Sequence, residues 1–298
     1  KEKNLDKIPF PARNLLPVGR YYSFVSKYRN YTIMITSRGC PYSCTFCEQR
    51  TGDIRYRSPE NVVAEIEECV TMHGVREIDI FDPLFTANKR RAIDICKQIC
   101  EKELKICWSC RSRVDLVDDE LLSWLKKAGC YRLYVGIESG DEGILKKINK
   151  NTSVAQIRKA VRLIKKHSLL AFGYFMIGCP GETKETAAKT ISLAKELQLD
   201  YAQFSRLSIL PGTGLYKAVE AEIGYDYWKK YVLDKNSKRE LPRIDCKLSN
   251  EELNSIIKSA YLGFYLRPVQ IFRTMSNIKS LDEFIRYSKA ALSMIFEH

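Results

Sequence analysis

The chain has 298 residues, 45% of them hydrophobic, with eleven cysteines and a formal net charge of +13. This length allows one large domain, or a domain with an extension, around a sizeable core. No stretch approaches the roughly 20 continuous apolar residues of a membrane-spanning helix, which argues against a transmembrane segment. The chain is too long for a small disulfide-stapled scaffold, and its polar start leads to no signal-peptide apolar region. We therefore expect reduced cysteines and a cytoplasmic location.

The positive charge is spread along the chain. The basic pairs at 126–127, 146–147, 165–166 and 229–230 lie far apart and form no single run. This pattern favours solvated helix faces, although a basic balance is also typical of proteins that bind nucleic acid or other anions. Nucleic acid therefore remains an open, less favoured partner.

The first 30 residues are predicted to be an irregular arm or linker. Pro9, Pro11 and Pro17 interrupt regular structure there. The next 185 or so residues alternate between apolar, β-branched runs and amphipathic stretches. The predicted strands are 31–36, 77–81, 106–110, 131–137, 170–177 and 201–207. The predicted helices are 59–73, 88–102, 118–127, 153–167 and 183–197.

Strict alternation of strands and helices predicts a parallel sheet with right-handed crossovers. Six such units fall short of a closed eight-fold barrel. Residues 216–298 differ from this rhythm, with an aromatic cluster followed by predicted helices at 249–266 and 280–296. We therefore expect an arm at 1–30, a core at 31–215 and a helical extension at 216–298 that covers the open side of the core.

The most informative stretch follows the first predicted strand. Cys40, Cys44 and Cys47 have the spacing C-x3-C-x2-C, on a loop leaving a strand end, where α/β folds place their active sites. Thiolates are soft ligands that suit iron–sulfur clusters and zinc. A fully ligated cubane takes four cysteines, so three would leave one iron open. A zinc site is the simpler alternative.

This motif, with Phe46 before its last cysteine, resembles that of the radical S-adenosylmethionine (SAM) enzymes. The resemblance implies a partial (β/α)6 TIM-like barrel and a 4Fe–4S cluster held by Cys40, Cys44 and Cys47. It also implies that the open iron chelates SAM, whose reductive cleavage gives a 5′-deoxyadenosyl radical that abstracts hydrogen from substrate. Phe46 would lie by the adenine. No side chain is singled out as catalytic, because the cofactors carry the chemistry.

The ends of the second and third strands supply two further candidates. By resemblance, the region of Asp82 contacts the SAM amino group, and helix capping is the alternative for this residue. Arg111 and Arg113 are two apart and share one face of a strand, where a guanidinium can bind a carboxylate bidentately. Arg113 is favoured as the partner of the SAM carboxylate, with an ion pair to Asp115 as the alternative.

The fourth and fifth strand ends complete the predicted SAM site. The resemblance assigns Glu138 and Ser139 to the ribose hydroxyls or the amino group of SAM. It places the backbone around Gly178 and Gly181 near the adenine, where glycines permit close approach. Glu182 is expected in the first turn of the following helix, where a carboxylate favours the helix dipole.

The other cysteines raise the possibility of a second cluster. Cys96, Cys100, Cys107 and Cys110 have suggestive spacing, but Cys107 and Cys110 should point to opposite faces of one strand. Buried free cysteines are the favoured interpretation. Cys130 and Cys179 lie near strand ends and are also expected to be buried.

Residues 8–17 and 264–268 resemble segments of the cobalamin-associated radical SAM subfamily, many of whose members are methyltransferases. We find no Asp-x-His-x-x-Gly cobalamin signature, so cobalamin is expected only through another domain or a partner. The expected partners are a small-molecule or lipid substrate and an electron donor such as a ferredoxin, a flavodoxin or a reductase. The alternatives are an RNA-modifying, methylthiotransferase-like enzyme and a non-catalytic iron–sulfur electron carrier.

Overall fold

The protein is described by a computed structural model, which covers residues 2–49, 53–234, 245–278 and 280–296, with side chains up to residue 289. A six-stranded sheet forms its centre, in the order β1-β4-β5-β6-β7-β8. Every neighbouring pair in this sheet is parallel. The strands are β1 (Tyr31–Met34), β4 (Glu77–Ile80), β5 (Cys107–Arg113), β6 (Cys130–Glu138), β7 (Leu170–Ile177) and β8 (Tyr201–Arg206).

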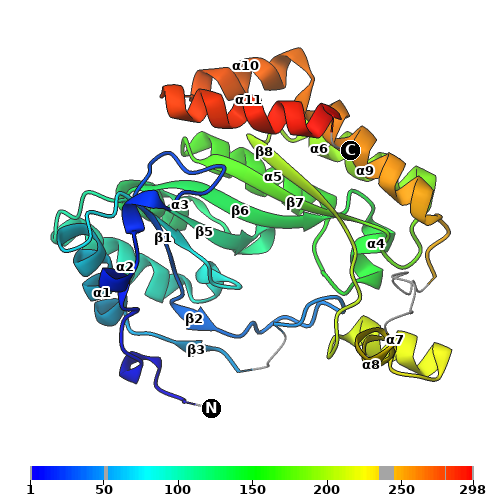
Figure 1. The fold of residues 1–298 in the computed structure, drawn as a ribbon, viewed down its shortest axis with the longest axis horizontal. Helices are drawn as coiled ribbons and strands as arrows, with labels where there is room; N and C mark the ends of the chain where they lie inside the picture. The colour runs from blue at the N-terminus through cyan, green and yellow to red at the C-terminus, as the bar shows by residue number, and fades with distance from the viewer. Residues whose placement is uncertain (1, 50–52, 235–244, 279, 297–298) are drawn as a thin grey trace.

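Helices connect successive strands and cover the outer face of the sheet (Figure 1). They are α1 (Pro59–Thr71), α2 (Lys89–Glu101), α3 (Asp119–Lys127), α4 (Glu142–Lys147), α5 (Val154–Lys166) and α6 (Lys184–Glu196). Polar caps fix where they begin: the side chains of Ser58, Asp118 and Thr183 each accept a backbone N–H of the first turn. Apolar faces of these helices bury a continuous core against the sheet.

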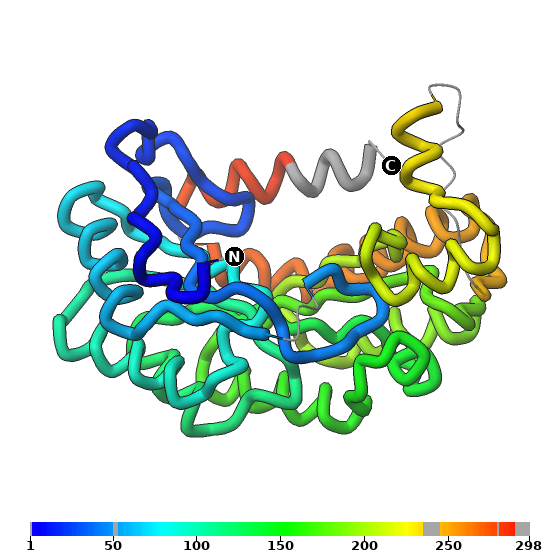
Figure 2. Tube along the Cα trace, turned by 90° about the horizontal axis from the view of Figure 1, so that it is seen from below, coloured from blue at the N-terminus to red at the C-terminus, as the bar shows by residue number. Residues whose placement is uncertain are grey.

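The strands and helices form an arc that does not close (Figure 2). The predicted partial (β/α)6 barrel is therefore confirmed, and all six strands and five connecting helices are found at the expected places. The sequence pattern did not predict the short antiparallel pair β2 (Ser37–Arg38) and β3 (Arg55–Tyr56). It also missed α4 and three helices of the extension.

The extension contains α7 (Gly214–Ile223), α8 (Tyr227–Leu233), α9 (Asn250–Tyr265), α10 (Pro268–Asn277) and α11 (Leu281–Phe296). Helix α9 lies along β8, the edge strand. The Tyr261 hydroxyl accepts the N–H of Phe204, and the Tyr265 hydroxyl accepts the N–H of Ala202 and donates to its carbonyl. These tyrosines satisfy backbone groups that an open edge would leave unpaired.

The N-terminal arm packs against β1, the strand at the opposite edge of the sheet from β8. It contains three short 3-10 helices, at Leu5–Lys7, Arg13–Leu15 and Val18–Arg20; two more, at Phe85–Ala87 and Val114–Leu116, follow β4 and β5. Arg286 of α11 donates to the carbonyls of Ser23, Phe24 and Ser26, and so ties the arm to the last helix. Within the described ranges, no helix is long and apolar enough to cross a membrane.

Candidate active site

The cysteine loop is held by backbone contacts from both sides. The Thr45 N–H donates to the Ile148 carbonyl at 3.0 Å, and the Thr45 carbonyl accepts the N–H of Leu215 at 2.9 Å. The Asn149 amide donates to the Ser43 carbonyl at 2.9 Å. The loop is thus clamped between the segment after α4 and the start of α7. This arrangement fixes the loop at the carboxyl ends of the strands.

The three predicted ligands lie together in this loop. Cys44 is buried, and Cys40 and Cys47 are half-buried. Burial raises the pKa of the Cys44 thiol, while the nearby cations of Lys150 and Arg113 act in the opposite direction. Burial likewise raises the pKa of Cys47. A buried thiolate ligand needs positive charge nearby, and these two cations provide it.

Arg113 lies directly beside Cys44. Its Nη1 donates to the Cys44 Sγ at 3.8 Å, and its Nε and Nη2 bind both carboxylate oxygens of Asp115 at 2.9 and 3.1 Å. Its Nη2 also donates to the Lys150 carbonyl at 2.7 Å, and the Tyr42 ring covers the guanidinium. The structural alternative for Arg113, a bidentate ion pair with Asp115, is therefore present. The contact between Arg113 and SAM stays a prediction. The guanidinium also lies beside the sulfur of Cys44, one of the three predicted cluster ligands.

Asp82 organises the start of the cysteine loop. Its carboxylate is fully buried and accepts the backbone N–H and the hydroxyl of both Thr36 and Ser37, at 2.5–3.0 Å. The helix-capping alternative is wrong, because Asn88 caps α2. With four donors on its two oxygens, the side chain holds the turn after β1. Contact between the Asp82 region and SAM is not tested by this geometry.

A buried ion pair that the sequence pattern missed lies next to the cysteines. Lys150 Nζ is 2.8 Å from Glu138 Oε1, and the two side chains are only 6% and 9% exposed. Glu138 has a left-handed φ of 68°, at a register shift between Gly136 and Glu138 in the β6–β7 pairing. A non-glycine residue held in this region costs about 1–3 kcal/mol and is typical of functional sites.

Gly136 makes room for this pair. A Cβ at position 136 would lie 2.3 Å from the Glu138 carboxylate and 2.7 Å from Lys150 Nζ. A larger residue at this position would therefore displace the ends of the Glu138 and Lys150 side chains from the places they have here. A lysine twelve residues after Glu138, in a short loop, gave no sequence signal of its own.

Ser139 and Glu182 both hold turns at strand ends; the contact of Ser139 with SAM stays a prediction, and the expected position of Glu182 is wrong. The Ser139 hydroxyl is buried against the Thr190 hydroxyl at 3.1 Å and accepts the N–H of Asp141. Glu182 is not in the first helical turn, because Thr183 is the N-cap of α6. Its carboxylate instead accepts the N–H of Cys179, and burial raises its pKa. Both side chains are used to hold strand-end turns.

Gly178 and Gly181 have left-handed φ values of 92° and 79°. A Cβ at Gly181 would lie 2.3 Å from the Lys147 Nζ, so both the backbone angle and the space favour glycine there. Phe46 packs against the apolar cluster that follows β8, which contains Ile209 and Leu215. These residues lie at the carboxyl ends of the strands, as the cysteine loop does. Their contact with adenine remains a prediction.

Most of the remaining cysteines are buried core residues. Cys110 is fully buried, with Cys96 and Cys130 beside it, and Cys179 is also buried. Cys107 is half-buried and lies near Lys27 and Glu77. Among the residues that the structure describes, no three His, Cys, Asp or Glu side chains are gathered to hold one metal ion.

The cysteine loop fits a cubane cluster better than a single ion. In a cubane each cysteine binds a different iron, so the thiols stand wider apart than around one zinc. The Thr45 hydroxyl, between Cys44 and Phe46, is buried without a hydrogen-bond partner. A soft donor set with an orphaned buried hydroxyl suits an inorganic cluster with its bridging sulfides.

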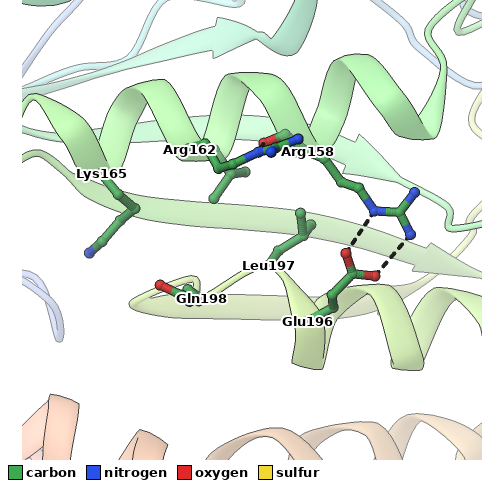
Figure 3. Close-up of a pocket in the computed structure, with 7 residues that line it drawn as sticks. Arg158, Arg162, Lys165, Glu196, Leu197 and Gln198 are labelled. Atoms are coloured by element: carbon green, nitrogen blue, oxygen red, sulfur yellow. Dashed lines mark hydrogen bonds and ion pairs between the residues drawn. The ribbon is translucent and has the colours of Figure 1, made fainter.

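A hollow of about 500 Å³ lies elsewhere, between α5 and α6 (Figure 3). It contains Arg158, Arg162 and Lys165. Arg158 binds both carboxylate oxygens of Glu196, at 2.7 and 2.9 Å, and Lys165 binds Asp200. Two of these three cations are paired with carboxylates, and Arg162 bonds only the Arg158 carbonyl, so among the residues that the structure describes the hollow has no cluster of unpaired cations that would favour a nucleic-acid site.

Comparison with known proteins agrees with this geometry. The model of the radical SAM superfamily matches residues 34–194. An uncharacterized methyltransferase, PH0819 of Pyrococcus horikoshii, is 37% identical over 273 residues, covering 89% of this chain and 57% of that protein. The chain belongs to the radical SAM superfamily.

Two further proteins are similar to this chain. An anaerobic magnesium-protoporphyrin IX monomethyl ester cyclase of Cereibacter sphaeroides is 34% identical over 201 residues, or 65% of this chain and 33% of the relative. The cobalamin-dependent SAM radical enzyme OxsB has a TM-score of 0.61 at 16% identity, covering 88% of this chain and 45% of that structure. The likeness to OxsB shows the fold alone. The chain spans about a third to just over half of the length of these proteins.

Proposed function

We propose that the protein is a radical SAM enzyme that functionalises a C–H bond, of a methyltransferase-like type. The observation that carries the proposal is the clamped loop with Cys40, Cys44 and Cys47 at the carboxyl ends of the strands, beside the buried pair of Lys150 and Glu138. When bound, the reduced 4Fe–4S cluster would supply the electron for the homolytic cleavage of SAM.

The chain's own residues bind and orient these groups. The three cysteines hold the cluster, and Arg113 donates to one ligand sulfur, which tunes its potential. Glu138, ordered by its contact with Lys150, would offer its side-chain oxygens to the ammonium or ribose of SAM. Phe46 and the turn at Gly178–Gly181 would pack against the adenine. Methyl transfer of the cobalamin type would need cobalamin held outside residues 1–298.

The partners follow from the same proposal. Reduction of the cluster needs a one-electron donor, such as a ferredoxin, a flavodoxin or a reductase. The substrate would be a small molecule or a lipid. The relatives support this range, because their names include a methyltransferase and a porphyrin cyclase.

The test is anaerobic reconstitution with iron and sulfide, followed by dithionite and SAM, with 5′-deoxyadenosine measured by mass spectrometry. Wild type and Cys110→Ala are expected to form the product, because Cys110 is a buried core residue away from the loop. Cys44→Ala is expected to form none. A wild-type protein that holds four irons and makes no 5′-deoxyadenosine would contradict the proposal.

A further inference from the structure

A cavity of about 600 Å³ lies on the inner face of the barrel. Its walls come from all six strands, from the arm at residues 22–25 and from α9. Nine of its sixteen lining residues are tyrosine or phenylalanine. This volume is that of a typical small-molecule site, and the aromatic fraction is far above that of the chain as a whole, which is 11%.

The cavity offers ring surfaces. Tyr134 and Tyr174 lie nearly parallel, with centroids 5.7 Å apart and an interplanar angle of 11°. Phe172 packs against both, at 4.7 and 5.2 Å. The hydroxyls of Tyr261 and Tyr265 are already bonded to the backbone of β8. The lining therefore favours contact with flat apolar surface.

The cavity carries no unbalanced charge. Asp79 and Arg111 are the only acidic or basic side chains among its lining residues, and they bind each other through two contacts, at 2.8 and 3.0 Å. Arg111 also donates to the Ile80 carbonyl, and its guanidinium lies 3.8 Å from the Phe81 ring centroid and 4.7 Å from that of Tyr134. Because three of its five N–H donors bind Asp79 and the Ile80 carbonyl and its charge is already paired, Arg111 is a weak partner for an anionic group.

The cavity adjoins the proposed cofactor site. Arg111 comes two residues before Arg113 on β5, and Tyr134 comes four residues before Glu138 on β6. Residues two apart on a strand share a face and lie about 7 Å apart. On β5, the cavity wall at Arg111 is therefore one such step from Arg113, whose Nη1 donates to the Cys44 Sγ. A ligand in the cavity can place one end at the cofactors.

We propose that this cavity binds the substrate, and that the bound part of the substrate is a flat, apolar ring system without negative charge. The inference rests on the proposed function, because a molecule bound in the cavity can be a substrate only if the cluster and SAM bind beside it. It narrows the substrate class: nucleic acids and small acids are disfavoured, and extended conjugated or polycyclic molecules fit.

The test uses the apo protein and two fluorescent probes with one skeleton. N-phenyl-1-naphthylamine is neutral, and 1-anilinonaphthalene-8-sulfonate adds one negative charge. We expect the neutral probe to bind at least tenfold more tightly. Equal or tighter binding of the sulfonate would show a site selected by charge and would overturn the inference.

Variants locate the bound probe. Tyr174→Ala removes a stacked ring and Gln203→Trp fills the cavity from an exposed position on its wall, so each is expected to weaken the neutral probe about tenfold. Ser192→Trp, on an exposed face of α6, is the matched control. Phe272→Ser tests the other exposed apolar surface, on α10, where Phe272 is 76% exposed. Neither control should change the affinity.

Loss of binding in Phe272→Ser with none in Gln203→Trp would place the probe on α10 and overturn the inference. Gln203→Trp keeps the test informative if Tyr174→Ala fails to fold, because position 203 is exposed. The readout needs neither cluster nor SAM. Absence of probe binding beside normal 5′-deoxyadenosine formation would reject this inference alone. The reverse result would reject the proposed function and would leave a binding cavity whose ligand is not the substrate of this chemistry.

Discussion

Replacing Lys150 by methionine tests the buried pair beside the cysteines. At 2.8 Å and an effective dielectric constant of about 20, the attraction between Lys150 and Glu138 is roughly 6 kcal/mol before desolvation is counted. Lys150→Met leaves the Glu138 carboxylate buried without its cation. Breaking a buried pair from one side typically costs about 3–5 kcal/mol. We expect a loss of this size in the free energy of unfolding of the apo protein, measured with urea.

The double variant Glu138→Gln/Lys150→Met is the control. It removes both charges, and we expect it to recover most of the lost stability, to within about 1–2 kcal/mol of wild type. Lys150→Met should also raise the pKa of the Cys44 thiol further, because one of its two neighbouring cations is gone. Slower alkylation of the Cys44 peptide near neutral pH would report this shift. A single variant that costs under about 1 kcal/mol, with no recovery in the double, would refute the reasoning.

Three further predictions concern the surrounding framework. Asp82→Asn should lower the free energy of unfolding by about 2–4 kcal/mol, because an amide nitrogen cannot accept the hydrogen bonds that the buried carboxylate accepts. The control Asp119→Asn, at an exposed position, should lower it by under about 1 kcal/mol. Urea unfolding measures both. Tyr265→Phe should cost about 1–3 kcal/mol and lower the hydrogen-exchange protection of the Ala202 amide; unchanged protection would contradict the edge contact. Burial raises the pKa of Glu182 in the folded protein. The contribution of Glu182 to stability is therefore complete below its pKa in the unfolded chain, and it is lost as the pH rises through its pKa in the folded protein. Urea unfolding should therefore show wild type losing stability relative to Glu182→Gln as pH rises above about 4.5, and a difference that does not change with pH would contradict this.

The sequence predicted the strands and the long helices because their signals are local. Apolar runs of β-branched residues and caps such as Ser58 and Asp118 act within a few residues of themselves. α10 is a short helix of ten residues that follows α9 directly, and its apolar face, with Val269 and Phe272, is exposed rather than packed on the core. The short α4 and the hairpin of β2 and β3 carry too few residues for a periodic signal.

The site was predictable only where the motif is contiguous. Cys40, Cys44 and Cys47 stand in eight residues, and their shared loop could be placed after a strand. Lys150 could not be found in the same way, because its partner lies across a glycine on another element. The roles of Asp82 and Ser139 depend on donors 45 to 51 residues away, which no local pattern reveals.

The central claim is that three cysteines hold a 4Fe–4S cluster whose fourth iron accepts SAM. Electron paramagnetic resonance of the dithionite-reduced, reconstituted protein tests it most directly, with and without SAM. We predict a reduced-cluster signal whose g values change when SAM is added, and loss of that signal in Cys44→Ala. A signal from a complete four-iron cluster that SAM leaves unchanged would contradict the account.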